Sequence, residues 1–532
     1  MIANRSPARR PAYVLIAVLL VVVVLSFASY RYVDAMTAEY SSATRQTQAM
    51  QAKAFAISGV HFAMAAMSDP NYFQQTIAGV YQDNPNAFQN AVAGTGDGPR
   101  GGGRFSLMNV SPDGNGGFNL SYGIADEAGK INVNAFMLLD PTGQVLYDAL
   151  MKLTAYGMTE DLADAIVDWL DADDTPRAAG AESGDYPNYR PKNGPINTLG
   201  ELLLVRGMTV QLLYGTDLNR NGVLDPDEAA GGGLSRGLSE FLTAYGHEAN
   251  VDTTGTGRID LTADTLSDVY EQLLASVPGE MADYILAYRM FTTTATGTTS
   301  QSSSTGGNSS GGGSSSGGGN SSGGTTATQT ATPEQVQSAV QLALTTGLGT
   351  SRRKPKSVTE FLNTQITLPQ TLGVPPNTPR FSYPSPLNNP DKLKLYLPSL
   401  LDKTSTTPGT ELIPRVNINV ASREVLMAIP GMTDEYADNI IATRGSLDPL
   451  DPATMTAAWL VTQMNMPTTT FNQMSRFITG TSQIYRVQSL GYFQNGGPTA
   501  RVEAVFDTNL GKPRIVFFRD LTELGKGFDP PR

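Results

Sequence analysis

Twelve residues from Asp217 to Glu228 have the spacing of a calcium-binding loop. Side-chain oxygens stand at positions 1, 3, 5 and 9, glycine at position 6 and glutamate at position 12. Calcium takes six to eight oxygens around one point, and this spacing wraps the chain around such a point. The segment that follows is a poor helix, so a structural ion is favoured over a switch; the alternative is a solvated Asn-Gly turn. The predicted ligands, with Val223 using its carbonyl, are Asp217, Asn219, Asn221, Val223, Asp225 and Glu228.

Two further acidic loops could bind calcium. Residues 171–186 follow a predicted helix end, and their carboxylates either converge on an ion or repel one another in solvent. The sequence leaves both interpretations open for the candidate ligands Asp173, Asp174, Glu182 and Asp185. The loop from Asp252 to Asp260 resembles a degenerate calcium loop, but Ala263 stands where the glutamate is required, so calcium binding by this loop is disfavoured.

No catalytic constellation accompanies these loops. The chain has two histidines and no cysteine, which excludes disulfides and thiolate metal sites, and it contains no nucleophile elbow, Walker loop or HExxH motif. His61 falls on a helical face, where packing is the favoured role. The sequence therefore predicts a protein that is not an enzyme, with Ca²⁺ as its only cofactor.

A long N-terminal helix is expected to position everything else. An apolar run from Ala12 to Ala28 follows a leader with three arginines, and no proline occurs up to Asp69. One helix over residues 12–68 would be roughly 85 Å long. The basic leader predicts a cytoplasmic N-terminus, with the bulk of the chain beyond the membrane. Past the apolar run, residues at heptad spacing form a stripe for assembly with other helices. This stripe includes Val33, Met36, Tyr40, Ala43, Met50 and Ile57.

Strand patterns occur near both ends of the chain, at 105–110 and 117–122 and again at 485–493, 499–507 and 514–519. The patterns between them are helical. The predicted fold is therefore α+β, with the N-terminal helix packed on an antiparallel sheet and a large helical domain inserted into that sheet. Residues 293–332 are almost entirely Gly, Ser, Thr, Asn and Gln and predict a disordered linker. Residues 352–400 predict irregular structure with one short helix near 357–363.

The predicted insert contains a threefold repeat. Residues 150–170, 273–289 and 425–444 each show a short helix, a glycine turn and a second apolar helix, each preceded by a short strand-like tag. This pattern is typical of helix-hairpin-helix, or SAM-like, units. Such units bind DNA when two glycines frame the turn, but here the second glycine is missing and the turns carry acids. With a net charge of −12 as well, nucleic-acid binding is disfavoured and packing or protein contact is favoured.

Specific segments resemble the K-type minor pseudopilins of bacterial type II secretion systems, over roughly residues 9–292 and 333–525. The resemblance is carried by residues 126–134 (DEAGKINVN), 166–174 (IVDWLDADD), 180–182 (GAE), 189–208 (YRPKNGPINTLGELLLVRGM) and 416–426 (VNINVASREVL). It implies a pilin-like core with two inserted SAM-like helical subdomains, a place at the tip of a short periplasmic filament, and calcium in the inserted region. The calcium loop at 217–228 and the Gly/Ser linker look like additions to the family pattern.

The resemblance also implies processing and partners. A prepilin peptidase is expected to cut between Ala12 and Tyr13, although prepilins are usually cut after glycine. Ala17 stands where most pilins carry a glutamate, a residue that the K family also lacks. Expected partners are other minor pseudopilins in a hetero-oligomeric tip complex and the inner-membrane secretion platform, with export of folded proteins as the function. The alternative is a single-pass membrane receptor for DNA uptake.

These expectations divide the chain as follows: a basic leader (1–12), the N-terminal helix (13–70, in the membrane to about 30), the first part of the pilin-like core (71–134), a helical region with the calcium loop (135–292), the linker (293–332), a second helical region (333–477) and the C-terminal core strands (478–532).

Overall fold

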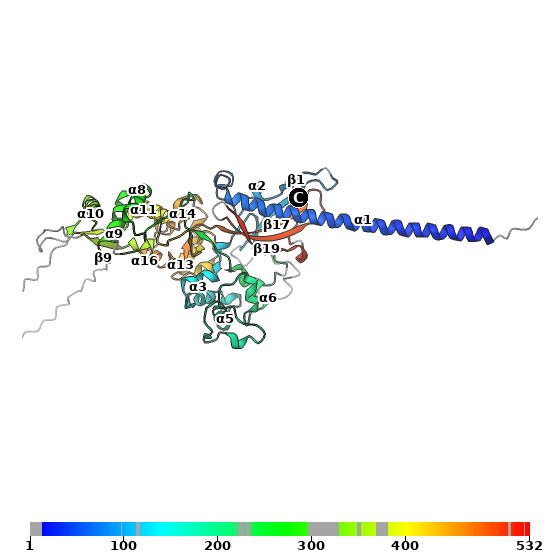
Figure 1. Ribbon diagram of the computed structural model, residues 1–532, viewed down its shortest axis with the longest axis horizontal. Helices are drawn as coiled ribbons and strands as arrows, with labels where there is room; N and C mark the ends of the chain where they lie inside the picture. Colours follow the sequence, from blue (N-terminus) through cyan, green and yellow to red (C-terminus); the bar gives the residue numbers. More distant parts are fainter. Residues whose placement is uncertain are drawn as a thin grey trace, which may run out of the picture.

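The computed structural model describes residues 13–96, 98–112, 118–217, 219–221, 228, 236–295, 329–347, 353–368, 381–508, 512–525 and 527–531. The molecule is elongated, with the helix α1 (Tyr13–Ser68) projecting from one end and α8, α9 and α10 at the other (Figure 1). The predicted long helix is confirmed. Its apolar N-terminal part contains an 18-residue window of mean hydropathy 2.6 with no buried residue, so α1 is a candidate membrane span.

The sheet of the core joins strands from both ends of the chain. Its order is β1-β2-β17-β18-β19, with β3 paired to β2 and β4 paired to β17, and all these pairings are antiparallel. The predicted packing of the N-terminal helix on an antiparallel sheet is thus confirmed. The strands are β1 (Ala91–Gly94), β2 (Gly103–Pro112), β3 (Phe118–Tyr122), β4 (Ala125–Asp126), β17 (Ile484–Phe493), β18 (Ala500–Asp507) and β19 (Arg514–Asp520).

Small residues let α1 lie close to this sheet. A Cβ added at Gly491 of β17 would come within 2.3 Å of the α1 backbone at Ala52 and Ala56, and one added at Gly59 would come 2.2 Å from the Ser489 hydroxyl. Ala63 continues this buried face toward the end of the helix. The sheet therefore covers a face of α1 built from small residues, in the C-terminal part of the helix.

The first helical part of the insert follows β4. Its elements are η2 (Glu127–Gly129), β5 (Ile131–Asn132), α3 (Val133–Leu139), α4 (Gln144–Leu150), η3 (Met151–Tyr156), α5 (Glu160–Leu170), η4 (Ser183–Asp185), η5 (Leu199–Leu204), α6 (Val210–Tyr214), η6 (Leu238–Glu240), β6 (Leu242–Thr243), β7 (Glu248–Ala249), β8 (Ile259–Asp260), α8 (Leu266–Ser276), α9 (Gly279–Met290) and β9 (Thr292–Ala295). The short helices η1 (Tyr72–Thr76) and α2 (Pro85–Phe88) precede the sheet.

The second helical part returns the chain to the sheet. It contains β10 (Gln329–Thr330), α10 (Pro333–Thr346), η7 (Val358–Phe361), β11 (Thr364–Thr367), β12 (Phe381–Pro384), η8 (Pro386–Asn388), α11 (Pro390–Lys403), β13 (Thr404–Ser405), β14 (Glu411–Leu412), β15 (Val416–Asn417), α12 (Arg423–Met427), α13 (Asp434–Arg444), α14 (Pro452–Met455), α15 (Trp459–Thr462), α16 (Thr468–Met474) and β16 (Ile478–Thr479), with η10 (Thr522–Leu524) near the C-terminus.

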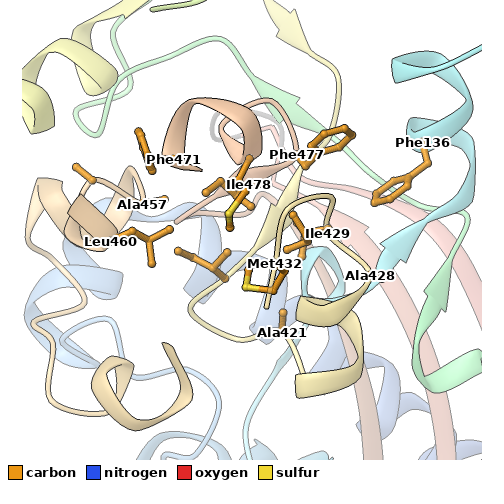
Figure 2. Packing of buried hydrophobic residues seen from close by; sticks show 14 of the residues in the cluster. Phe136, Ala421, Ala428, Ile429, Met432, Ala457, Leu460, Phe471, Phe477 and Ile478 are labelled. Carbon is orange, nitrogen blue, oxygen red and sulfur yellow. The ribbon is translucent and has the colours of Figure 1, made fainter. Parts of the chain in front are cut away.

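The two helical parts share one hydrophobic core. The rings of Phe136 in α3 and Phe477 before β16 lie 5.9 Å apart, and buried residues from both parts form a continuous cluster (Figure 2). Residues more than 300 positions apart therefore pack in one core. The two helical parts form a single unit, although the predicted linker separates them in the sequence.

All three predicted repeats form a helix, a turn and a second helix. The turn glycines Gly157 and Gly431 have φ values of 87° and 88°, which an L side chain rarely adopts, whereas Gly279 begins α9. Each preceding tag is a short strand in a parallel pair: β5 with β6, β8 with β13, and β15 with β16. Assignment of these units to the helix-hairpin-helix class stays a prediction.

The expectation of mostly irregular structure over 352–400 was wrong. This segment contains the strands β11 and β12, in a four-stranded sheet with β9 and β10, and most of the fourteen-residue helix α11. Asn389 caps α11 by accepting hydrogen bonds from two backbone N–H groups, and Pro390 occupies its first turn, where proline loses no helical hydrogen bond. The prolines of this segment therefore occur at the start of a helix and, at Pro398, inside it.

Candidate functional site

Three carboxylates converge beside the end of α5. Single oxygen atoms of Asp168, Asp171 and Glu182 all lie within 4.8 Å of one another. Asp168 is 0% exposed and Glu182 is 3% exposed, so water screens their charges poorly. We call these three residues the carboxylate cluster.

Helix geometry and a tight loop assemble this cluster. Asp168 lies in the last turn of α5 and Asp171 caps its C-terminus. The loop then returns so that backbone N–H groups of Arg177 and Ala181 donate to the Asp168 carboxylate at 3.2 and 2.8 Å. Gly180 is required there, because a Cβ at that position would come 1.8 Å from an Asp168 oxygen. The close turn places Glu182 opposite the helix end.

Several oxygens of the cluster have no protein partner. Among the described residues, no group donates a hydrogen bond to Asp171 Oδ1 or to either carboxylate oxygen of Glu182, although these atoms are buried. Asn193 Oδ1 is likewise buried without a donor, while its amide nitrogen donates to the Asp173 carbonyl in the same loop. Buried acceptors without donors are costly, and they are the hard oxygen ligands that calcium prefers.

The pKa values of the three cluster carboxyls are raised, which also indicates that too little positive charge lies nearby. Burial, together with the charges of Asp168, Asp171 and Asp174, raises the pKa of Glu182 to about 7. Burial and the charges of Asp173 and Asp168 raise the pKa of Asp171 to about 6. Burial also raises the pKa of Asp168. A divalent cation among these oxygens would reverse each effect, so the donor set fits calcium.

The predicted ligands of this loop have different positions. Glu182 is in the cluster, and Asp174 lies beside it, accepting a hydrogen bond from the Ser183 backbone at 3.3 Å. Asp173 is exposed and accepts from the Thr175 backbone. Asp185 forms an ion pair with Arg206 at 3.0 Å.

The predicted acidic loop includes Asp171, but neither Asp171 nor Asp168 is among its candidate ligands. A useful signal was present, because Asp168 interrupts an apolar helix segment, Ile166-Val-Asp-Trp-Leu170. An acid inside an apolar helical face needs a partner, and here the partners are other acids.

The loop predicted to bind calcium at 217–228 is described only in part. Val223 and Asp225 lie outside the described residues. The backbone N–H of Asn221 donates to both Asp217 Oδ1 and Asn219 Oδ1, at 3.0 and 2.9 Å, and that of Asn219 donates to Glu228 Oε1 at 3.2 Å. The side chains at positions 1, 3 and 12 therefore gather around the turn. Their role as ligands stays a prediction.

This loop also contacts the core sheet. The Asn221 side chain donates to the Gly527 carbonyl at 2.7 Å, the buried Arg501 of β18 donates to the Asn219 carbonyl, and Gln488 of β17 donates to the Arg220 carbonyl at 2.8 Å. A change in the conformation of the loop would therefore alter its hydrogen bonds to β17, β18 and the C-terminal tail.

The predicted assembly stripe lies mostly in the open on α1. Val33, Met36, Tyr40 and Met50 are 58%, 43%, 77% and 68% exposed; Ala43 is exposed and Ile57 is half-buried. The sheet covers a different face, built from Ala52, Ala56, Gly59, Val60 and Ala63. Tyr13 begins α1, whereas Ala12 lies outside the described residues, so the predicted cleavage site is not tested.

Comparison with known proteins finds a family match over part of the chain. Residues 129–214, which contain the carboxylate cluster, match the family model "Type II secretion system (T2SS), protein K". No curated protein matches the sequence. A chain of the crystal structure of the GspK-GspI-GspJ complex from the enterotoxigenic Escherichia coli type 2 secretion system is similar at 8% identity and a TM-score of 0.29, over 93% of this chain and 99% of that chain. The family match over residues 129–214 agrees with the resemblance seen in the sequence.

Proposed function

We propose that this chain is a non-enzymatic minor pseudopilin that helps initiate the pseudopilus and stays at its tip, in support of export of folded proteins across the outer membrane. The match of residues 129–214 to a secretion family supports this role over DNA uptake. The proposed location is the inner membrane, crossed once by α1, with the N-terminus in the cytoplasm and the bulk of the chain in the periplasm.

The free face of α1 is the observation that carries this proposal. Met36 and Tyr40 lie beyond the apolar span and before the sheet begins to cover the helix, and both are exposed. A helical stripe at heptad spacing that its own sheet does not cover is suited to packing against other helices of the same kind. The proposed partners are other minor pseudopilins in a hetero-oligomeric tip complex, together with the secretion platform in the inner membrane.

The size of the insert supports a position at the tip. The part of the helical body with α8, α9 and α10 lies beyond the end of α1 that is farthest from the membrane span, and α5 and α6 lie below the sheet (Figure 1). A filament in which copies of this chain stack along their N-terminal helices would need that volume for the next copy. Because two bodies cannot share one volume, we propose that this chain terminates a filament and does not form one by itself.

Calcium is the proposed ligand of the carboxylate cluster. Asp168, Asp171 and Glu182 would hold the ion, and the loop at 217–228 would hold a second through the ligands predicted from its sequence. The ions would neutralise buried carboxylates and so stabilise the helical part. We further propose that a prepilin peptidase removes residues 1–12, which leaves Tyr13 at the start of the mature chain.

Charge on the stripe tests the assembly role. Met36→Glu or Tyr40→Lys places an ion in the proposed helix–helix seam, and we expect loss of co-purification with the other minor pseudopilins and loss of secretion. The periplasmic part should keep its wild-type melting temperature, because neither side chain packs on the sheet.

Ser42→Glu is the matched control. Ser42 is exposed and lies about 200° around the helix from Tyr40, so its charge should leave assembly intact. Normal secretion by both stripe variants, or long homopolymers of the purified wild-type protein, would contradict the proposal.

A further inference from the structure

The loop between Asp252 and Asp260 shows calcium-loop features without the full ligand set. Oδ1 of Asp252 accepts hydrogen bonds from the backbone N–H groups of Thr254 and Thr256, at 2.8 and 2.9 Å, and from the Thr254 hydroxyl at 2.6 Å. These contacts wrap the turn around the first carboxylate, as in a calcium loop. The other carboxylate oxygen of Asp252, Oδ2, does not take part in this turn and contacts α11 instead.

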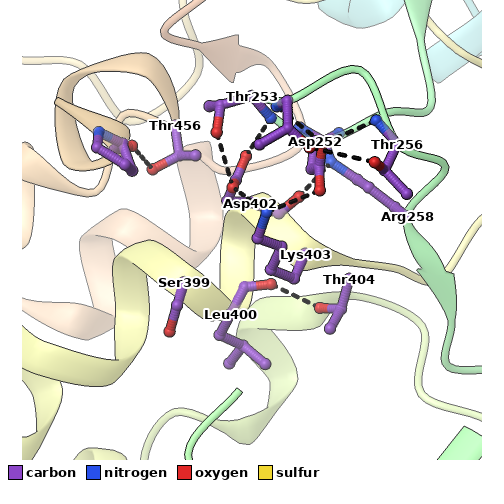
Figure 3. A network of polar contacts seen from close by, with 12 residues as sticks. Asp252, Thr253, Thr256, Arg258, Ser399, Leu400, Asp402, Lys403, Thr404 and Thr456 are labelled. Atoms are coloured by element: carbon purple, nitrogen blue, oxygen red, sulfur yellow. Dashed lines mark hydrogen bonds and ion pairs between the residues drawn. The ribbon is translucent and has the colours of Figure 1, made fainter. Parts of the chain in front are cut away.

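A lysine ammonium from α11 occupies that position. Nζ of Lys403 lies 2.7 Å from Asp252 Oδ2 and 3.4 Å from Asp402 Oδ2 (Figure 3). The Asp252 and Asp402 side chains are 7% and 4% exposed, whereas that of Lys403 is 27% exposed. The ammonium of Lys403 thus lies close to two nearly buried carboxylates, and the lysine side chain itself is the most exposed of the three.

The second carboxylate completes the closure of the loop. Asp402 accepts hydrogen bonds from the Thr253 backbone at 2.8 Å and from the Thr253 hydroxyl at 3.0 Å, and its backbone carbonyl accepts from Arg258 at 3.0 Å (Figure 3). Directly after Lys403, β13 pairs in parallel with β8, at the end of the same loop. The loop is therefore bound to the C-terminal end of α11 at several points.

We propose that Lys403 is the built-in cation of this loop. Its ammonium takes the place that calcium takes in loops of this pattern, and it makes the contact between the two helical parts independent of metal. The position at the C-terminal turn of α11 favours a cation through the helix dipole. In agreement, hydrogen bonds from Lys403 and Thr254 outweigh burial and hold the pKa of Asp252 below its usual range.

The consequence is a clasp across the predicted linker. Asp252 and Lys403 are 151 positions apart, on opposite sides of residues 293–332. Because the cation is covalently part of the chain, this clasp holds in a compartment that lacks free calcium. The inference concerns this loop alone and does not rest on calcium at the carboxylate cluster or on the proposed role in secretion.

Lys403→Met in the full-length protein in detergent tests the proposal. Methionine keeps an apolar stem but removes the charge, so two buried carboxylates lose their cation. We expect the melting temperature in chelator to fall by several degrees and millimolar calcium to restore at least half of that loss, beyond any calcium effect seen in the wild type. Potassium at equal ionic strength should restore none. A variant that melts like the wild type in chelator, or that calcium does not rescue, overturns the proposal.

Two further variants complete the test. Lys354→Met removes an equally short ion pair, 2.8 Å from Asp264, but its side chains are 53% and 83% exposed, so it should lose little stability and gain no calcium response. Asp252→Asn leaves the lysine in place, and calorimetric titration should find as many calcium ions bound as in the wild type. If Asp252→Asn binds one ion fewer, the native loop holds calcium and the proposal is wrong; this readout serves even if Lys403→Met fails to fold.

Discussion

The carboxylate cluster and the Lys403 clasp both contain nearly buried carboxylates, but the pKa values shift in opposite directions. In the cluster, burial raises the pKa values of Asp171 and Glu182 to about 6 and about 7. In the clasp, the pKa of Asp252 is lowered although its side chain is also nearly buried. The difference is a cation supplied by the chain. Buried carboxylates are tolerated when the fold provides a positive charge, and otherwise they need protons or an external ion.

A third acid extends the comparison to a fully buried position. Glu127 is 0% exposed at the junction of the insert and the sheet, where Arg486 binds it through two hydrogen bonds of 2.8 and 2.7 Å. Burial alone would raise the pKa of Glu127, but Arg486 and Lys130 outweigh it and lower the pKa to about 2. The third guanidinium nitrogen of Arg486 donates to Glu503 at 2.7 Å.

The largest effect should come from removing this internal cation. Arg486→Gln removes the bidentate cation of the buried Glu127 and leaves only Lys130, 3.8 Å away, and we expect a loss of about 3–5 kcal/mol in the free energy of unfolding. Denaturant unfolding measures it. Arg423→Gln is the matched control, because Arg423 also binds two carboxylates but is 45% exposed, and it should lose at most about 1 kcal/mol. Similar losses for the two variants would show that burial does not decide the effect.

Calcium removal should have the next largest effect. At calcium concentrations a hundredfold above the dissociation constant, binding to the cluster would stabilise the protein by about 3 kcal/mol, and chelation would remove this. Glu182→Gln should lose most of the calcium-dependent rise in melting temperature. In chelator it should melt no lower than the wild type, because it removes one of three mutually repelling charges.

Asp185→Asn separates the observed cluster from the loop predicted by sequence. Asp185 pairs with Arg206 outside the cluster, so this variant should keep the calcium-dependent rise. If Asp185→Asn loses the rise while Glu182→Gln keeps it, the ligand set is not the one proposed.

The pH dependence of the chelated protein should be intermediate in size and of defined sign. The ordinary pKa values are 3.8 for Asp171 and 4.5 for Glu182, and the folded values are about 6 and about 7. The folded state therefore binds more protons, and its stability falls as pH rises from about 4 to about 7. The melting temperature of the wild type relative to Asp171→Asn/Glu182→Gln should fall between pH 5 and pH 8 in chelator. A flat difference, or a rise with pH, would contradict the cause assigned to these pKa values.

A smaller effect is expected at the loop 217–228. Glu228→Gln removes the bidentate charge predicted at position 12, and we expect it to weaken calcium binding and to reduce stability in calcium by about 1–2 kcal/mol. Part of the loop is held without the ion, through Asn221 and Gly527 and through Arg501 and Asn219. Equal melting of Glu182→Gln and the double variant Glu182→Gln/Glu228→Gln in calcium would argue against a second site.

The smallest effect should follow deletion of residues 301–324. This segment is rich in Gly and Ser and cannot supply a core, so shortening it should change the free energy of unfolding by less than about 1 kcal/mol. Denaturant unfolding of the shortened protein checks this expectation. A large loss of stability would show that the deleted segment is structured.

Local patterns in the sequence were enough for much of the fold. The absence of proline from Ala12 to Asp69, with heptad spacing, predicted α1. Runs of β-branched and aromatic residues between turn signals predicted β17, β18 and β19 within one or two residues. The predicted glycine turns at Gly157 and Gly431 were also correct, whereas Gly279 is the first residue of α9. These features depend on neighbours a few positions apart, so local propensity and periodicity reveal them.

The same reasoning predicted only part of the carboxylate cluster. Glu182 was among the predicted ligands, but Asp168 was counted as part of an apolar helix, and its burial beside Glu182 depends on how the loop through Gly180 folds back. The acid content of a loop predicts that it could bind calcium. It does not predict which carboxylates lie close together in the folded protein.

What the sequence by itself determined is the set of elements: a helix long enough to cross a membrane and continue, strands at both ends of the chain, helical pairs between them, and loops rich in oxygen ligands. The tertiary structure alone decided which charges meet. Lys403 reaches Asp252 across 151 positions and Arg486 reaches Glu127 across 359, whereas Arg177, near the carboxylate cluster, forms its ion pair with Asp164. The physical reason is that electrostatic energy depends on distance and burial in space, which chain spacing does not encode.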